Sequence, residues 1–515
     1  MRIARVLAAV LGVVVVVPAI SAGCISAADN CERSARCEPP GAGATGMGAG
    51  GSDAGTSPMC IPSQADGPVD DNCGIFVSKS GNDMNTGTKG SPVATIGHAI
   101  LEANGTNRPI YVCNEAFAEV VEAPAGIELY GGLDCASGWT WSEAGRTTLT
   151  AAPDSVPLKL TSGAAVTRVE NFTVTAADAM QLGGSSVAAI IDNVTAEIAR
   201  CELTARAGRD GMNGDESQSA APGAPGVPGV IACSPVPVMG GPGGMTMCGD
   251  LVSLGGSGGN GGVPGMAING QPGGNGQPDS GDPAKGKGGL GQDAVNLCES
   301  GANGANGISG APGAGATELG MLSISGISGG TGPNGGDGTP GQGGGGGGGG
   351  KAGVCSGGTP GAGASGGGGG AGGCGGKGGA GGGSGGSSIA LISLNSTLKL
   401  TQVTLTAGTG GIGGNGALGE GGGSGGTGGN GGSKVNAGSF EGCSGGKGGS
   451  GGDGGPGGGG RGGHSLGIAF RGTPPPAEGY TLTPGAPGNG GVGATMDPAG
   501  IGAMGMAVAT PVEFP

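Results

Sequence analysis

Cysteine is the residue type with the widest chemical repertoire in this chain, which contains 14 cysteines. None lies in a CxxC pair and none has a histidine partner nearby, so the spacing does not predict a zinc site. Because disulfides persist in oxidising compartments, the cysteine content favours an exported protein. The spacing suggests local pairs, although it does not determine connectivity: Cys31 with Cys37, Cys60 with Cys73, Cys113 with Cys135, Cys233 with Cys248, and Cys355 with Cys374.

The N-terminus has the pattern of a secretory signal peptide. Arg2 and Arg5 precede an apolar run from Val6 to Val17, and small residues follow as far as Gly23. A basic head, a short apolar segment and a small-residue exit are typical of such signals. The run is shorter than the roughly 20 apolar residues that a spanning helix needs. We therefore expect residues 1–23 to be a signal peptide.

Cys24 follows this segment directly and resembles the lipobox cysteine of bacterial lipoproteins, which is acylated and becomes the mature N-terminus. The chain departs from that pattern at Ser21, where an aliphatic residue is usual. The resemblance implies a membrane partner through a lipid anchor on Cys24, at the outer membrane or cell surface. The alternative is cleavage after Ala28 and secretion.

Few other side chains could support catalysis. His98 and His464 are the two histidines; we expect the first on the solvent face of a helix and the second at the border of a glycine tract. No serine lies in an activated nucleophile elbow, and the sequence GGSGGD at 448–453 matches a calcium-repeat core once only. The charged candidates are singly spaced: Asp178, Asp192, Arg168 and Arg200. We predict no catalytic residue, no cofactor and no metal site.

Trp139 and Trp141 are candidates for stacking on sugars. Their W-x-W spacing would place both rings on one face of a strand. The alternative is that they pack at a sheet edge.

The composition restricts both the partner and the core. Glycine accounts for 138 of 515 residues, and the net charge is −15. Glycine has no side chain to bury and loses the most backbone entropy on ordering, so much of the chain cannot form an ordinary core. Proteins that bind nucleic acid carry basic patches, so this charge argues against a nucleic-acid partner and against docking on anionic membranes through basic residues.

Residues 75–103 carry a second resemblance. A short strand, a loop with Ser80-Gly81-Asn82-Asp83 and Asn85, and a helix opening at Ser91-Pro92 and running to about Ala103 are expected here. This arrangement is similar to the segment that precedes right-handed parallel β-helices of the pectin-lyase-like type. The resemblance implies an all-β fold, a right-handed parallel β-helix with an N-terminal capping helix. The glycine-rich low-complexity tracts would be long insertions in that fold. The resemblance implies no activity.

The following residues are consistent with that fold. Short β-branched runs separated by turns occupy 110–176. Asn171 and Asn193 are candidates for left-handed turn residues, and their spacing predicts a coil of 20–25 residues.

Residues 183–214 and 385–416 align without a gap, and weaker echoes occur at 320–336 and at 461–491. Each unit is a strand pair followed by a glycine-rich excursion, so we expect the islands to stack as coils and the tracts to be insertions. The tracts are either disordered or extended polyglycine strands with three residues per turn. They lack the proline content and unbroken period of collagen. They look like PGRS-type repeats of bacterial surface proteins, without that family's helical N-terminal domain.

These observations predict a domain order and a function. The expected segments are a signal peptide (1–23), a flexible Gly/Ala/Pro linker (24–72), a β-helix with its N-terminal cap (73–207), a glycine-rich insertion (208–384), a returning coil (385–407), a second insertion (408–463), and terminal coils with a C-terminal cap (464–515). We expect a non-enzymatic cell-envelope or secreted protein, structural or adhesive, whose partners are polysaccharide or other envelope proteins. The alternative is a polysaccharide lyase or hydrolase of the pectin-lyase-like fold.

Overall fold

The computed structural model of the chain describes residues 60–65, 67–106, 108–216, 219–235, 238–495 and 497–515. The chain divides into two compact units, Met1–Gly55 and Thr56–Pro515, and all described residues belong to the second. The predicted signal peptide, Cys24, the pair of Cys31 with Cys37 and most of the predicted linker lie outside the described residues. Within the described part, no helix is long and apolar enough to cross a membrane.

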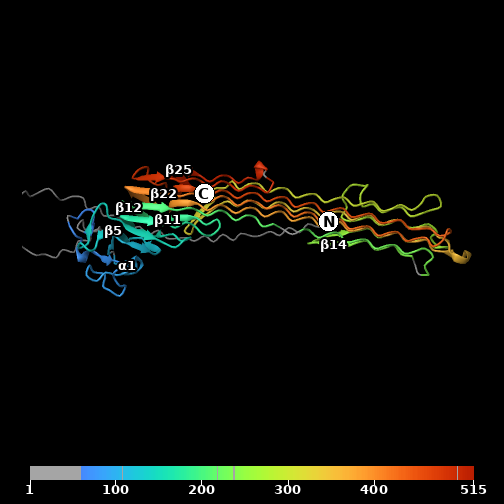
Figure 1. Cartoon of the computed structure of the whole chain (residues 1–515), viewed down its shortest axis with the longest axis horizontal. Coiled ribbons are helices and arrows are strands. Elements are labelled where there is room, and N and C mark those ends of the chain that lie inside the picture. The colour runs from blue at the N-terminus through green and yellow to red at the C-terminus, as the bar shows by residue number, and fades with distance from the viewer. Residues whose placement is uncertain (1–59, 66, 107, 217–218, 236–237, 496) are drawn as a thin grey trace, which may run out of the picture. The chain divides into compact units, whose positions relative to one another are not determined.

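Three sheets with mainly parallel strands form one part of the second unit (Figure 1). The first sheet contains β1 (Ile75–Val77), β2 (Ile110–Cys113), β5 (Glu128–Asp134), β9 (Val166–Glu170), β12 (Thr195–Ala199) and β21 (Thr397–Thr401), with β6 (Thr140–Trp141) antiparallel to β5. The second contains β3 (Ala116–Ala118), β7 (Thr147–Thr150), β10 (Phe172–Thr175), β13 (Glu202–Ala205), β22 (Val403–Ala407) and β24 (Tyr480–Thr483). The third contains β4 (Val121–Pro124), β8 (Leu158–Thr161), β11 (Ser186–Asp192), β20 (Ser388–Leu394), β23 (Ser465–Arg471), β25 (Ala507–Val508) and β26 (Val512–Glu513). The predicted all-β class is confirmed.

Three antiparallel hairpins and three short helical turns complete the described elements. They are β14 (Met245–Cys248) with β15 (Leu251–Leu254), β16 (Met321–Ser323) with β17 (Gly326–Ser328), β18 (Gly353–Val354) with β19 (Pro360–Gly361), and the 3-10 turns Asp71–Cys73, Ser356–Gly358 and Pro498–Gly500.

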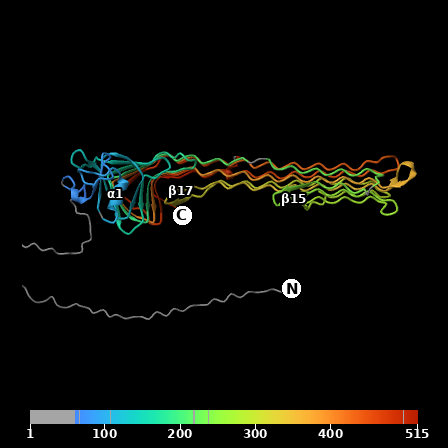
Figure 2. The same cartoon turned by 90° about the horizontal axis from the view of Figure 1, so that it is seen from below.

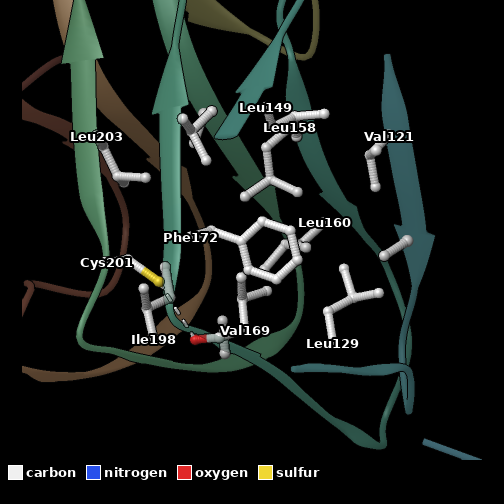
Figure 3. Packing of buried hydrophobic residues seen from close by; sticks show 14 of the residues in the cluster. Val121, Leu129, Leu149, Leu158, Leu160, Val169, Phe172, Ile198, Cys201 and Leu203 are labelled. Atoms are coloured by element: carbon white, nitrogen blue, oxygen red, sulfur yellow. Dashed lines mark hydrogen bonds between the residues drawn. The ribbon is translucent and has the colours of Figure 1, made fainter. Parts of the chain in front are cut away.

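The three sheets share one apolar interior, because alternate residues of each strand point inward. Figure 3 shows side chains from all three sheets converging. They include Leu129, Val169 and Ile198 of the first sheet, Leu149, Phe172 and Leu203 of the second, and Val121, Leu158 and Leu160 of the third. Each fully buried aliphatic side chain of this kind contributes about 1.5–3 kcal/mol.

The helix α1 (Ile96–Ala103) packs on this interior through Ile96, Ala99, Ile100 and Ala103. It ends where the sequence predicts, but its predicted start at Ser91-Pro92 is wrong. Val93 instead bridges to Val77, and the Thr95 side chain accepts a hydrogen bond from the backbone N–H of His98, which makes Thr95 the N-cap.

The predicted coil of 20–25 residues is met in one step of the stack and exceeded in the next. Thr148 pairs with Thr173 at a separation of 25 residues, whereas Thr173 pairs with Glu202 at a separation of 29. Asn171 precedes a strand of the second sheet, whereas Asn193 precedes a strand of the first, so the two residues occupy different corners. Both do adopt the left-handed conformation that the sequence suggested, with φ of 60° and 49°.

The two copies of the sequence repeat, 183–214 and 385–416, stack directly on each other in the structure. β11, β12 and β13 pair in parallel with β20, β21 and β22, and partners such as Ser186 with Ser388 are 202 residues apart. The register extends beyond the strands, since the backbone N–H of Asn415 bonds to Asn213 at the same separation. Residues 461–491 supply β23 and β24 of the next layer. The echo at 320–336 does not join the three sheets: it forms the β16–β17 hairpin, which packs on the outer face of the third sheet through Leu322.

The glycine-rich segments run side by side in both views (Figures 1 and 2) and are joined by backbone hydrogen bonds. The glycine run 343–350 is buried throughout. It donates N–H bonds to 364–370, 299–302 and 271–274, and it accepts bonds from 256–262, 289–292 and 443–446. Each neighbour is met at every third residue, as expected of a polyproline II helix with three residues per turn. The extended-strand alternative therefore describes these tracts, and we call them the glycine bundle.

Segments that are surrounded by more neighbouring segments contain more glycines in each group of three residues. The run 343–350 has six neighbouring segments and contains glycine only. Residues 206–216 and 219–229 lie at the surface and contain fewer glycines. Gly208, Gly211 and Gly223 are separated by multiples of three residues and donate to the parallel segment 409–430.

Polar side chains replace missing neighbours at the edges of the glycine bundle. Gly372 donates its backbone N–H to Ser253 Oγ on β15, at 2.8 Å. The next donors along the segment 372–381 lie past the hairpin turn that precedes β15. There the backbone N–H of Gly378 donates to Asp337 Oδ1 at 2.8 Å, and that of Gly381 donates to Asn334 Oδ1 at 2.9 Å. These side chains satisfy backbone donors that no further segment covers.

Gly346→Ala tests the packing of the glycine bundle. A Cβ atom at this position would lie 1.9 Å from the carbonyl oxygen of Ser257, so backbone would have to move. We expect the free energy of unfolding to fall by about 2–3 kcal/mol. The matched control is Gly421→Ala, where a Cβ would meet nothing within 4 Å; it should change stability by less than about 0.5 kcal/mol. Denaturant unfolding followed by circular dichroism compares the two, and equal losses would contradict the packing.

Candidate functional site

Five disulfides join the described cysteines. Cys60 with Cys73 and Cys113 with Cys135 are paired as the spacing predicts. The predicted pairs of Cys233 with Cys248 and of Cys355 with Cys374 are wrong: Cys233 bonds Cys355, and Cys248 bonds Cys374. A fifth disulfide, of Cys298 with Cys443, was not predicted. The glycine bundle runs out and back, which brings residues more than 100 positions apart into contact and defeats a prediction from local spacing.

Cys201 is the free thiol among the described residues, and it is buried. Desolvation raises the pKa of this thiol to about 12, and its Sγ donates to the carbonyl oxygen of Ala199. It is therefore a packing residue rather than a nucleophile.

Removal of a long-range disulfide should cost more stability than removal of a local one. The pair of Cys248 with Cys374 closes 126 residues and that of Cys60 with Cys73 closes 13. The chain-entropy relation predicts losses of about 5 and about 3 kcal/mol for the two double serine variants. Guanidinium unfolding measures both, and a larger loss for the short loop would contradict the expectation.

Neither tryptophan is arranged for the predicted stacking on one strand face. Trp139 lies outside β6 with φ of 65°, and 4% of its surface is exposed. Its ring packs edge-on to Phe76 at 4.9 Å between centroids, so it is not available to a sugar. Trp141 is half-buried under the guanidinium of Arg200, 5.5 Å from its ring centroid. The packing alternative describes Trp139.

Three of the four charged candidates have partners within the protein. Arg168 pairs with Glu197 on the first sheet, and Arg200 pairs with Glu170. Asp178 accepts a hydrogen bond from the backbone of Ala207. Asp192 is at the end of β11 in the third sheet. The structure does not bring these four candidates together.

The two histidines also have structural partners. His98 bonds Glu102 on α1, and 31% of its side chain is exposed. His464 is buried at the start of β23, where its Nε2 donates to the Leu319 carbonyl and its Nδ1 accepts from the backbone N–H of Met506. Burial lowers the pKa of His464 below its ordinary value of 6.5.

His464 should make stability fall in mild acid. Its folded pKa is lower than its unfolded one, so the neutral form stabilises the fold above about pH 6.5, and this contribution is lost as pH falls toward the folded pKa. Because the chain has two histidines, a proton NMR titration can follow both ring signals. We expect the His464 signal to titrate below 6.5, and a midpoint above 6.5 would contradict its buried neutral state.

The glycine bundle carries a concave site beside the hairpin β14–β15. The hairpin β14–β15 ends partway along the glycine bundle, while segments such as 330–342 and 372–384 continue past its turn (Figure 2). Two cavities of about 450 and about 500 Å³ flank the hairpin and share Leu251 and Pro340. We call this pair of cavities the step cleft.

The hairpin is held rigidly in place by its own sequence. Alternating residues in 245–254 give strand periodicity, and Gly249 with φ of 61° permits the tight turn. Ser253 Oγ donates to the Gly341 carbonyl at 2.9 Å, and the disulfide of Cys248 with Cys374 ties the hairpin to the adjacent segment. The step cleft is therefore preformed.

The lining of the step cleft combines aliphatic and acidic groups. The first cavity is lined by Met247, Leu251, Asp337, Lys377 and Glu420, among others. The second is lined by Val252 and Ile308 beside Asp279, Asp282 and Gln342. Neither lining includes an aromatic ring. Among the described residues, no group of three or more His, Cys, Asp or Glu side chains could hold a metal ion.

The sequence contains a signal for the step cleft that the predictions did not use. Residues 245–254 (MTMCGDLVSL) alternate with a period of two, inside tracts with a glycine period of three. This change of period marks a hairpin that interrupts the glycine bundle.

Comparison of the chain with protein-family models, with curated proteins and with solved structures finds no match in any of the three.

Proposed function

We propose that this chain is an exported, non-enzymatic structural or adhesive protein of the cell envelope. One observation carries the proposal: the glycine-rich tracts form a hydrogen-bonded bundle in which most glycines allow neighbouring backbones to pack closely. Such a bundle supplies rigid surface and few reactive groups. Its natural use is to support a binding surface, which is a mechanical role.

The proposed scaffold is a right-handed parallel β-helix. From β2 to β23, consecutive strands join the first, second and third sheets in turn, with β6 and the hairpins as departures from that order. After β23, β24 joins the second sheet and β25 and β26 join the third. α1 covers one end of the shared interior, which is what a capping helix would do. In this interpretation the glycine bundle consists of two insertions, at 208–384 and 408–463, with a shorter excursion in 484–506.

The proposed attachment is a lipid on Cys24. The residues between Cys24 and Cys60 would then act as a tether, because Ile61 and Val69 already pack against the first sheet. The scaffold would stand away from the outer membrane. The pattern of Arg2, Arg5 and the apolar run supports export.

Mass spectrometry of the mature N-terminal peptide, taken from the envelope fraction of the native host, tests this proposal. We expect Cys24 as the first residue with acyl chains attached. An unmodified N-terminus between Ala22 and Asp29, on protein recovered mainly from the medium, would overturn the anchor and leave a secreted protein. Turnover of a glycan panel by the purified chain would overturn the non-enzymatic role.

A further inference from the structure

The hairpin β14–β15 exposes aliphatic side chains on the surface of the glycine bundle. Met245 pairs across the hairpin with Leu254, and Met247 with Val252, so the four side chains share one face. Their exposed fractions are 60% and 67% for the methionines and 38% and 39% for Leu254 and Val252. The opposite face carries Thr246 and Ser253, which are buried. A strand pair with its aliphatic face outward, beside two cavities, marks an interaction surface.

Carboxylates flank this aliphatic face on both sides. Asp279 and Asp282 line the second cavity, and no lysine or arginine lines it with them. Asp337 and Glu420 line the first cavity, with Lys377 as its one cation. Asp279 and Asp282 also line an adjacent cavity, where Lys285 and Lys287 accompany them. The step cleft is therefore apolar at its centre and net acidic at its rims.

The floor of the step cleft is partly glycine backbone. Gly338, Gly375 and Gly376 line the first cavity, and Gly307 lines the second. A Cβ atom on any of these glycines would meet a carbonyl oxygen of a neighbouring bundle segment within 2.1 Å, so their close contacts are made inside the glycine bundle. The linings lack the aromatic rings on which sugars stack, and their acidity disfavours nucleic acid.

The geometry points to an extended segment of a partner protein as the occupant, with aliphatic side chains alternating with lysine or arginine. The partner's aliphatic side chains cover Met247 and Val252, which share the outward face of the hairpin and line one cavity each. The cations meet the carboxylates of Asp279 and Asp282 on one side and of Asp337 and Glu420 on the other. This assignment names the partner class for the proposed adhesive role and rests on it.

Methionine methyl NMR on the purified mature chain tests the assignment. The probe is the capped peptide Gly-Leu-Lys-Leu-Lys-Gly, and Gly-Leu-Glu-Leu-Glu-Gly is its charge-reversed control. We expect the first peptide to shift the Met245 and Met247 signals saturably and the second to leave them unchanged. Met84 and Met180 are 93% and 70% exposed outside the glycine bundle and should not respond. Substitution of Met247 by leucine assigns the signal.

The acidic rim is tested with the double variant Asp279→Asn, Asp282→Asn. Each carboxylate accepts a backbone hydrogen bond within its loop, from Gly281 and Ala284, and asparagine can keep that bond. We expect peptide affinity to fall about tenfold at low salt, with an unchanged methyl spectrum of the free protein. The control Glu143→Gln removes an exposed carboxylate outside the glycine bundle and should leave the affinity unchanged.

Three results would overturn the assignment: no saturable shift with the lysine peptide, equal shifts with both peptides, or equal losses in the double variant and in Glu143→Gln. These outcomes are separate from the test of the anchor. An unacylated Cys24 removes the membrane attachment and leaves peptide binding intact, whereas failure of peptide binding says nothing about the N-terminus.

Discussion

The backbone hydrogen bond between neighbouring glycine-rich segments is the interaction on which the rest of the structure depends. At Gly346, a single added Cβ would sit 1.9 Å from a neighbouring carbonyl oxygen. The bundle therefore has almost no side-chain core, and its stability comes from many modest hydrogen bonds together with close backbone contact. Its long-range disulfides offset part of the large backbone entropy that ordered glycine loses.

The sheets set the register of the glycine bundle. Ser186 pairs with Ser388 inside the third sheet, and the same separation persists where Asn213 meets Asn415 well beyond the strands. The apolar interior is an ordinary core and specifies its alignment through alternating inward side chains. Polyglycine has no such signal, because a slip of three residues places glycine on glycine again. We infer that the sheets are what align the bundle.

Sequence patterns predicted the features that side chains encode. The all-β class, the left-handed Asn171 and Asn193, the end of α1 at Ala103 and the in-register repeat all follow from residue types at a fixed spacing. The failures concern the path of the chain. The step from Asn171 to Asn193 links two corners instead of two coils, and Cys248 pairs 126 residues away because the tract between them turns back. The step cleft is made where segments end, which a local pattern does not reveal.

Each excursion of the glycine bundle leaves the sheets and comes back to them, so its reach can change without any change to the sheets. Adding one glycine triplet to an outgoing segment and one to the returning segment lengthens that excursion by one turn, about 9 Å. The hydrogen-bonding pattern repeats at every turn, so the added residues find partners of the same kind as those already present. The length of the glycine bundle can therefore change during evolution in steps of one turn while the fold of the sheets is kept.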